Sequence, residues 1–434
     1  MSMLAVLRRP RLGRLTAAGM LSEVGDWLLM IALPLFVLDL TGSALVTATV
    51  FALELVPTVL VGPIAGVLVD RYERWALMSV VATAQALCLL PLFAVQSAQD
   101  LWIVYVVVVV ESVLGTIIEP ARNAAATVLV PTSDLMAMNG LLGTTSSIAR
   151  LVGGPLGGLI FGLAGLEGVI TADAATFVVT ALLLAAWPAR RAAGTEAASV
   201  GSSAAPPAGA VSLGVVRGWL DGLRLVARSP MLRRLMGVVG CMALAQGAFA
   251  VLFVLFVVRD LGGSASDVGI LRGVQAIGAI AAGALLGLLI KRMTATRLLA
   301  VSLAAFGVLS LVTWNLPLLS TAFGLYVGLF IAVGFPGLAS MTGLMTLLQS
   351  HSADSNRGRI LSTFFAVYGG VQALGMLLAG TVGTGAGLTV TLQVQGVLYL
   401  VAAGLALRLR QAGEPAGQSP TSAALPEVIL SSSE

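Results

Sequence analysis

The chain has 434 residues, of which 58% are hydrophobic and 10% are charged, with a formal net charge of +4. A soluble domain carries about 25% charged residues, and surface-to-volume scaling leaves much of any soluble fold exposed to water. The composition therefore excludes a soluble enzyme, a nucleic-acid-binding module and a disordered protein, and it indicates that lipid surrounds most of the chain.

Apolar segments of about 20 residues, the length that crosses a bilayer, recur along the whole chain. The first six predicted spans cover 14–38, 44–69, 75–97, 101–121, 138–163 and 168–188. After a long loop, six more cover 231–257, 265–290, 296–315, 318–347, 360–381 and 385–407. We therefore expect an all-α integral membrane protein with 12 transmembrane helices.

The longest loop divides the chain into two halves. Residues 1–189 are predicted to form an N-terminal six-helix bundle, and residues 230–410 a C-terminal six-helix bundle. The cytoplasmic linker between them, 190–229, begins rich in Ala, Gly, Ser and Pro and ends with the spacing of a short amphipathic helix. Residues 411–434 are predicted to be a disordered cytoplasmic tail. Two weak matches between the halves indicate an internal repeat, which is typical of secondary transporters.

The 24 Lys and Arg residues show on which side the loops lie. With an even number of spans, 21 of them fall on the side that holds both termini, and Arg122 is counted there, in the loop after span four. Only Arg259 falls on the other side. Cytoplasmic loops carry the excess of Lys and Arg, so both termini are predicted to be cytoplasmic.

Ionisable residues inside the spans are candidate functional residues, because a charge at the bilayer centre costs about 2.5–3.5 kcal/mol or more. A buried carboxyl among other carboxyls binds a proton more readily than one in water, so one or two acids are expected to load and release protons. Arg150 stays charged and is expected to be a counter-charge for Glu54 or Glu111. Any of these residues could instead serve helix packing alone. The candidates for proton coupling or for lining a central cavity are Glu23, Asp26, Glu54, Glu111, Arg150, Asp173 and Arg272.

Several segments resemble the major facilitator superfamily. Gly62-x3-Gly66-x3-Asp70-Arg71-x2-Arg74 is similar to that family's motif between spans two and three. The resemblance covers roughly residues 14–408 and implies two pseudo-symmetric bundles. Four other segments narrow it to the drug:proton antiporter branch with macrolide and siderophore exporters: Glu23-Val24-Gly25-Asp26-Trp27, Asp39-Leu40-Thr41-Gly42-Ser43, Glu119-Pro120-Ala121-Arg122 and Arg357-Gly358-Arg359.

The resemblance also implies roles for two glycine-containing segments. Gly62, Gly66, Asp70, Arg71 and Arg74 would form a cytoplasmic gate that latches the two halves in the outward-open state. Span five contains a segment similar to the antiporter motif, with one residue fewer between Gly-Pro and Gly-Gly, and its proline is expected to bend the helix. That segment comprises Gly153, Gly154, Pro155, Gly157 and Gly158. Span four lacks the membrane arginine of other drug-antiporter branches and has Glu111 instead.

The predicted function is proton-coupled export of amphiphilic small molecules, such as drugs or macrolides, across a bacterial-type inner membrane by alternating access. The expected partners are a small-molecule substrate, protons and the lipid bilayer, without nucleic acid, cofactor or metal, and the monomer is expected to be functional. Excess acid in the cavity favours cationic or neutral cargo. An enzyme is disfavoured because there is no paired nucleophile and base. The alternatives are a dedicated exporter of a natural product or siderophore, a lipid flippase on the same fold, or a non-transporting sensor.

Overall fold

The computed structural model describes residues 10–131, 134–185, 223–289, 293–352, 357–382 and 387–410. Across these ranges the chain forms helices joined by turns, without a β-strand. Ten helices within them are long and apolar enough to cross a membrane. The chain is therefore a multi-pass helical membrane protein.

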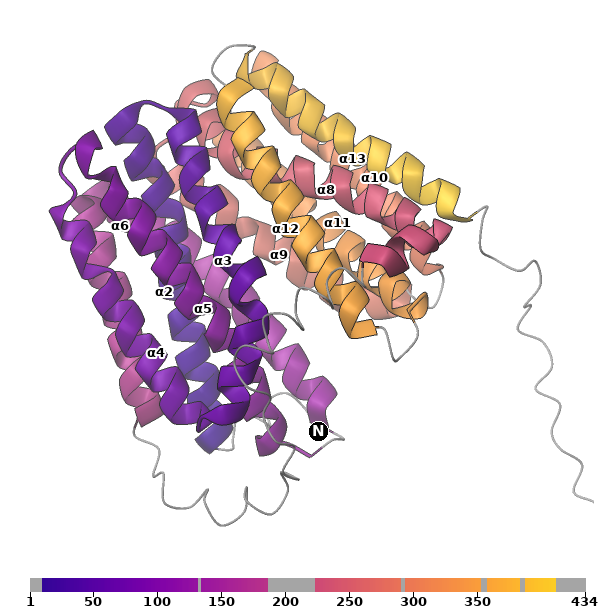
Figure 1. Ribbon diagram of the computed structural model, residues 1–434. Helices are drawn as coiled ribbons and strands as arrows, with labels where there is room; N and C mark the ends of the chain where they lie inside the picture. Colours follow the sequence, from indigo (N-terminus) through magenta and orange to yellow (C-terminus); the bar gives the residue numbers. More distant parts are fainter. Residues whose placement is uncertain are drawn as a thin grey trace, which may run out of the picture.

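The first half of the chain forms one group of helices, which we call the N-bundle (Figure 1). Polar side chains begin two of its helices, since Ser43 accepts a hydrogen bond from the N–H of Val46 and Glu73 accepts from the N–H groups of Trp75 and Ala76. Its elements are α2 (Pro10–Thr41), α3 (Ala44–Arg71), α4 (Arg74–Cys88), the 3₁₀ turns Leu90–Ala94 and Ala98–Asp100, α5 (Leu101–Leu129) and α6 (Leu135–Ala185).

The last element of the N-bundle, α6, is 51 residues long and is broken within its length. The break is at Gly165, whose φ of 61° and ψ of −161° are not helical and suit a residue without a Cβ. It falls between the predicted spans 138–163 and 168–188. Pro155 lies inside the helix, and the non-helical backbone is at the glycine beyond it.

The second half of the chain forms the C-bundle (Figure 1). Residues 223–228 are helical and Ser229 caps the helix that follows them, whereas 190–222 of the predicted linker and the predicted tail 411–434 lie outside the described residues. The elements of the C-bundle are α8 (Pro230–Leu255), a π-helical turn (Phe256–Asp260), α9 (Ala265–Leu289), α10 (Ala295–Asn315), α11 (Phe323–Ser350), α12 (Arg357–Val382) and α13 (Leu388–Arg410).

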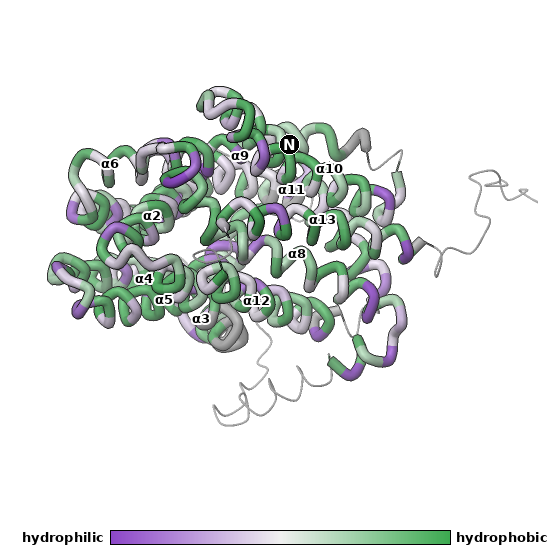
Figure 2. The backbone as a smooth tube through the Cα atoms, turned by 90° about the horizontal axis from the view of Figure 1, so that it is seen from above, coloured by the Kyte–Doolittle hydropathy of each residue, from purple (hydrophilic) through white to green (hydrophobic). Residues whose placement is uncertain are grey.

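The outer surface of the helices is apolar. Val80, Trp102 and Leu182 are each more than 60% exposed, and the backbone seen from above is hydrophobic along most helices (Figure 2). Water would oppose so much exposed apolar surface, so this surface fits acyl chains.

Among the described residues, the two bundles share a hydrophobic core at one end of the molecule and not at the other. Ile31 and Phe51 of the N-bundle pack there in one buried cluster with Phe249 and Leu252 of the C-bundle. At the other end each bundle has its own core: one gathers around Leu12 and Trp75, and a separate one forms within the C-bundle. We call the first the closed end and the second the open end. Figure 1 shows the same arrangement, since the bundles meet at the top of the view and separate below.

Glycines bring the bundles into contact at the closed end. A Cβ added at Gly158 of α6 would lie 2.8 Å from the carbonyl carbon of Ala265 in α9. A Cβ added at Gly380 of α12 would lie 2.7 Å from the Cβ of Ala48 in α3. No side chain fits at either contact, so the absence of a Cβ sets how closely the bundles meet.

Candidate functional site

Glu23 and Arg122 form an ion pair between α2 and α5. Nη1 of Arg122 donates to Oε1 of Glu23, and Arg122 is only 8% exposed. The guanidinium lies across Gly19, because a Cβ added there would be 2.8 Å from Nη1 of Arg122. The expected loop position of Arg122 is therefore wrong: α5 continues to Leu129, and Arg122 is a buried helical residue paired with one of the candidate acids.

Glu111 of α5 is held by Gln85 of α4. Nε2 of Gln85 donates to Oε1 of Glu111 over 2.6 Å. The other carboxyl oxygen of Glu111 and Oε1 of Gln85 are both buried, and neither has a hydrogen-bond partner among the described residues. A proton on Glu111 would supply the donor that these two acceptors lack. Sequence reasoning missed Gln85 because it searched the spans for charge, and an amide carries none.

Asp26 and Glu54 differ from the other candidate acids because they are exposed although they lie far inside α2 and α3. Asp26 is one turn from Met30, and Glu54 is one turn from Phe51; both neighbours line a pocket between the bundles. Residues one turn apart share a helix face. The two carboxylates therefore lie on the faces that border the space between the bundles.

Asp173 is a fully buried acid on α6. It lies against Gly25 of α2, where an added Cβ would overlap the Oδ1 of Asp173 and the hydroxyl of Thr176. Oδ1 accepts a 3.4 Å hydrogen bond from that hydroxyl, and Oδ2 is buried without a partner among the described residues. Because Gly25 has no side chain, the carboxylate of Asp173 fits against α2 at the position next to Asp26.

The five candidate acids form one electrostatic group in the N-bundle. Asp26 lies near enough to Glu111, Asp173, Glu23 and Glu54 for each of them to act on its charge, and Glu111 also interacts with Glu54 and Asp173. Within the described ranges, no group of three or more His, Cys, Asp or Glu residues is arranged to hold a metal ion.

The two candidate arginines lie together, apart from these acids. Arg150 of α6 has its guanidinium 5.8 Å from the ring centroid of Trp27, and Arg272 of α9 has its guanidinium 5.0 Å from that of Phe249. Arg150 is near enough to act on the charge of Arg272. The expected pairing of Arg150 with Glu54 or Glu111 does not occur: where the chain is described, neither arginine has an ion pair.

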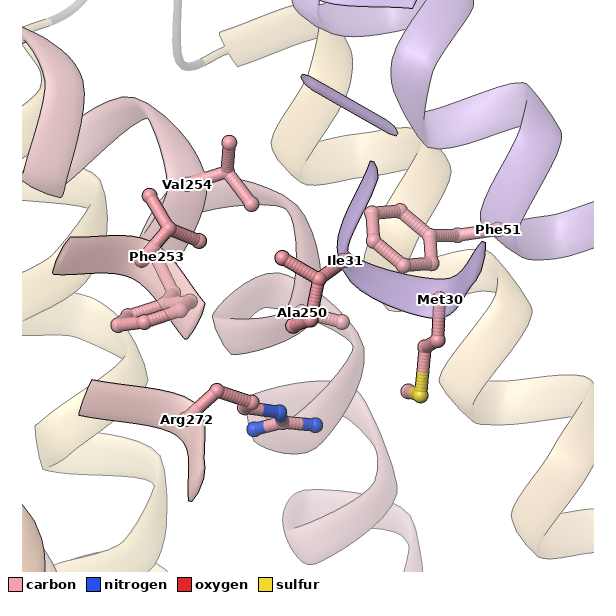
Figure 3. A pocket seen from close by; sticks show the side chains of 8 residues that line it. Met30, Ile31, Phe51, Ala250, Phe253, Val254 and Arg272 are labelled. Carbon is pink, nitrogen blue, oxygen red and sulfur yellow. The ribbon is translucent and has the colours of Figure 1, made fainter. Parts of the chain in front are cut away.

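Arg272 lines a pocket that both bundles build (Figure 3). The pocket is small in this conformation, with room for little more than a water molecule, and it is partly open to solvent. Its other walls are Met30, Ile31, Phe51, Ala250, Phe253, Val254 and Val268, all apolar. The combination of one charge with an otherwise apolar lining is typical of a site for small molecules.

The Gly-Pro segment of α6 packs on two sides. A Cβ at Gly153 would lie 2.7 Å from the Cβ of Trp27, and one at Gly157 would lie 2.8 Å from the carbonyl oxygen of Leu28, both on α2. Gly154 and Gly158 instead contact α9 of the other bundle, where Gly269 and Ala265 lie. Gly153 and Gly157 thus pack inside the N-bundle, whereas Gly154 and Gly158 form part of the contact between the bundles.

The predicted gate segment spans the end of α3 and the start of α4, at the open end. Gly62, Gly66 and Asp70 lie in α3 and Arg71 ends it; the guanidinium of Arg71 is 5.9 Å from the ring centroid of Tyr72. Arg74 begins α4, and its Nη1 donates to the carbonyl oxygen of Ala124 in α5 over 3.2 Å. These contacts stay within the N-bundle, as expected of an end at which the bundles are apart.

Comparison with known proteins identifies the family. The family model described as transmembrane secretion effector, MFS_3, matches residues 1–432. The chain belongs to this family. As a transmembrane secretion effector, it is a membrane transporter of the major facilitator superfamily and not an enzyme.

The relatives and solved structures agree with this assignment. The chain is 28% identical to macrolide efflux protein A of Streptococcus pyogenes over 38% of the chain and 41% of that protein. It is 26% identical to the uncharacterized MFS-type transporter YfiS of Bacillus subtilis over 39% of the chain and 40% of that protein. The aligned parts thus span about two fifths of these relatives.

A bacterial homologue of the iron transporter ferroportin has the same fold at 16% identity. In its inward-facing state the TM-score is 0.71, covering 93% of this chain and 99% of that one. In its outward-facing state the TM-score is 0.59, covering 92% and 99%. The bundles of this chain are therefore arranged more like those of the inward-facing state.

Proposed function

We propose that the chain exports amphiphilic small molecules, such as drugs or macrolides, in exchange for protons. The single observation that carries this proposal is the exposure of Asp26 and Glu54 deep inside their helices, beside an apolar pocket that both bundles line. A lipid-facing carboxylate would be very costly, whereas a carboxylate bordering a water-filled space can exchange protons with it. The family and the macrolide efflux relatives support export.

The proposal assigns separate tasks to the two bundles. The N-bundle carries protons on its acid group, with Glu111 and Gln85 behind the exposed Asp26 and Glu54. The pocket binds the substrate. A proton that neutralises a carboxylate favours one arrangement of the bundles, and the substrate favours the other, so each promotes the release of its counterpart.

The proposed architecture has 12 spans in two six-helix bundles. α6 counts as two spans, divided at Gly165, and α3 counts as one. We further propose that the open end faces the cytoplasm with both termini, that the membrane is a bacterial-type inner membrane, and that the monomer transports its substrate. The excess of Arg at the open end supports this orientation, although the burial of Arg122 removes one residue from that count.

Efflux from intact cells tests the proposal. Cells producing the protein would be loaded with a panel of fluorescent amphiphiles, cationic, neutral and anionic, and efflux would be followed with and without a protonophore. We expect efflux that the protonophore abolishes. Asp26→Asn should lower it to the level of the empty vector, because asparagine does not bind the transported proton. Glu111→Gln should do the same while preserving the shape of the side chain.

Glu167→Gln is the matched control, because Glu167 is an exposed acid of the same bundle outside the acid group. It should leave efflux unchanged at equal amounts of protein in the membrane. Efflux that resists the protonophore would contradict proton coupling but leave export standing. The absence of efflux for every compound, together with full tolerance of Asp26→Asn, would favour the non-transporting alternative.

A further inference from the structure

Arg150 and Arg272 come from different bundles, and the packing of α6 on α9 holds them together. The next residue after each one is at the contact itself: a Cβ added at Gly273 would lie 3.2 Å from the carbonyl oxygen of Leu151. One turn further along α6, Gly154 touches the backbone of Gly269 and Gly273. Since backbone meets backbone here, the main-chain positions from which the two arginines project are held close together while the closed end stays closed.

Among the residues that the structure describes, these two cations have no counter-charge. In the described part of the chain neither guanidinium makes a hydrogen bond or an ion pair, and the Nε of Arg150 is buried without any partner. Aromatic faces partly satisfy them, since Trp27 lies under one and Phe249 under the other. An aromatic face leaves the N–H donors of a guanidinium free for an acceptor in the plane of the group.

The acids of the N-bundle do not supply that acceptor. Glu23 is paired with Arg122, Glu111 accepts from Gln85, and Asp173 lies against Gly25. Asp26 and Glu54 are exposed, and within the described ranges neither forms an ion pair with either arginine. Two like charges with free donors thus lie on the two sides of the contact between the bundles, near enough for Arg150 to act on the charge of Arg272.

The geometry points to a binding site for an oxyanion on an apolar body. We propose that Arg150 and Arg272 together bind a carboxylate or phosphate group of the substrate, while its apolar part lies in the pocket against Met30, Phe51 and Phe253. Guanidinium groups bind such oxyanions through paired hydrogen bonds. Arg272 points into the pocket, toward Ala250 and Met30, which places the charged group at the edge of the apolar lining (Figure 3).

This inference rests on the proposed function and narrows its substrate. The acids alone favoured cationic or neutral cargo, but the charged residue that lines the pocket itself is Arg272. A bound oxyanion would neutralise the repulsion between α6 and α9, so it would stabilise the closed end. A zwitterion would also fit, with its cationic group toward Asp26 and its anionic group on the arginines.

Binding to the purified protein tests the inference without any flux or proton gradient. The protein would be held in nanodiscs of uncharged lipid and titrated with four amphiphiles that share an octyl chain: octyl phosphate, octanoate, octyl glucoside and octyltrimethylammonium. Inorganic phosphate is the fifth probe, because a free anion and an anionic headgroup share the same chemistry. We expect octyl phosphate and octanoate to bind at least about tenfold more tightly than octyl glucoside, and the cation to bind most weakly.

Variants identify the groups responsible. Arg272→Gln and Arg150→Gln should each remove the preference for the anions and leave the affinity for octyl glucoside unchanged. Arg272→Lys should keep part of it, because the charge remains and the fork of donors is lost. Arg259→Gln, at an exposed arginine of the closed end, should bind all probes as the wild type does.

The remaining outcomes separate the inference from its alternatives and from the proposed function. Equal binding of the anionic and uncharged amphiphiles would overturn it, as would an equal loss for both in Arg272→Gln, which would give the arginine a purely structural role. Tight binding of inorganic phosphate and of no other probe would show that the ligand needs no apolar part, which contradicts that half of the proposal. Anion binding without efflux in cells would contradict export but support the anion site. Efflux of cationic dyes without anion binding would support export but contradict the anion site.

Discussion

Arg122 shows how a single buried charge is accommodated in the N-bundle. The ion pair with Glu23 and the space left by Gly19 satisfy a guanidinium that is 8% exposed. Removing one partner of a buried pair leaves the other charge uncompensated, which costs about 3–5 kcal/mol.

Arg122→Met is therefore expected to destabilise the protein by about 3 kcal/mol or more, measured as a lowered melting temperature and as a lowered yield of folded protein in detergent. The double variant Glu23→Gln/Arg122→Met should recover part of the loss, because no charge is then left unpaired. Arg408→Met, at an exposed arginine, should melt like the wild type. A double variant no more stable than Arg122→Met would show that packing, and not charge, is the cause.

The candidate site was predictable to the extent that its members carry charge. Asp26, Glu54 and Glu111 stand out in apolar spans, and the structure places them near one another. Gln85 is neutral, and its partnership with Glu111 depends on the register between two helices, which one sequence does not contain. The helical position of Arg122 was not predicted for a different reason. The Ala-rich turns after Ala121 are too weakly hydrophobic for hydropathy to extend the span.

At the scale of an element, α6 combines two kinds of contact within a few residues. Gly153 and Gly157 touch α2 of the same bundle, whereas Gly154 and Gly158 touch α9 of the other. The spacing of four residues predicts that each pair shares a face. It does not reveal the partner of each face, because that depends on how the bundles meet.

Gly158→Ala is expected to loosen the closed end, since the new Cβ would overlap the backbone of Ala265. The population should then shift toward the state in which the open end closes. Spin labels at Val128→Cys and Ser350→Cys, with both native cysteines replaced by alanine, would report a shorter distance across the open end. Gly162→Ala on the same helix, whose Cβ would have Ser266 Oγ at 4.0 Å, should leave the distance unchanged. An unchanged distance in Gly158→Ala would mean that the closed end accommodates the added methyl group without a shift in the conformational population.

The helices themselves follow from hydropathy, whereas the exact residue at which a helix is broken does not. Span boundaries such as 44–69 and 231–257 lie close to α3 (Ala44–Arg71) and α8 (Pro230–Leu255). The division of α6 at Gly165 agrees with the gap between two predicted spans. A bend was predicted at Pro155 because proline removes a helical hydrogen bond. The positive φ is instead at Gly165, a residue that the resemblance did not single out.

For the whole molecule, the proposed orientation makes a direct prediction. In a chain with Cys88 and Cys241 replaced by alanine, Arg259→Cys at the closed end should react with a membrane-impermeant maleimide added to intact cells. Ser350→Cys at the open end should react only after the cells are made permeable. The opposite pattern would place both termini outside and would reverse the direction proposed for transport.

The ionisable residues are divided unequally between the two bundles, and this division has an electrical consequence. The five carboxylates of the acid group all belong to the N-bundle, together with Arg122 and Arg150, and Arg272 belongs to the C-bundle. Moving one elementary charge across the whole membrane potential changes the free energy by about 2.3 kcal/mol per 100 mV. When access passes from one side to the other, each ionised carboxylate becomes connected to the opposite solution, whereas a protonated one contributes nothing. Voltage therefore acts on this protein mainly through the N-bundle, and its influence on the cycle depends on how many of those five groups hold a proton beside the fixed charges of Arg122 and Arg150.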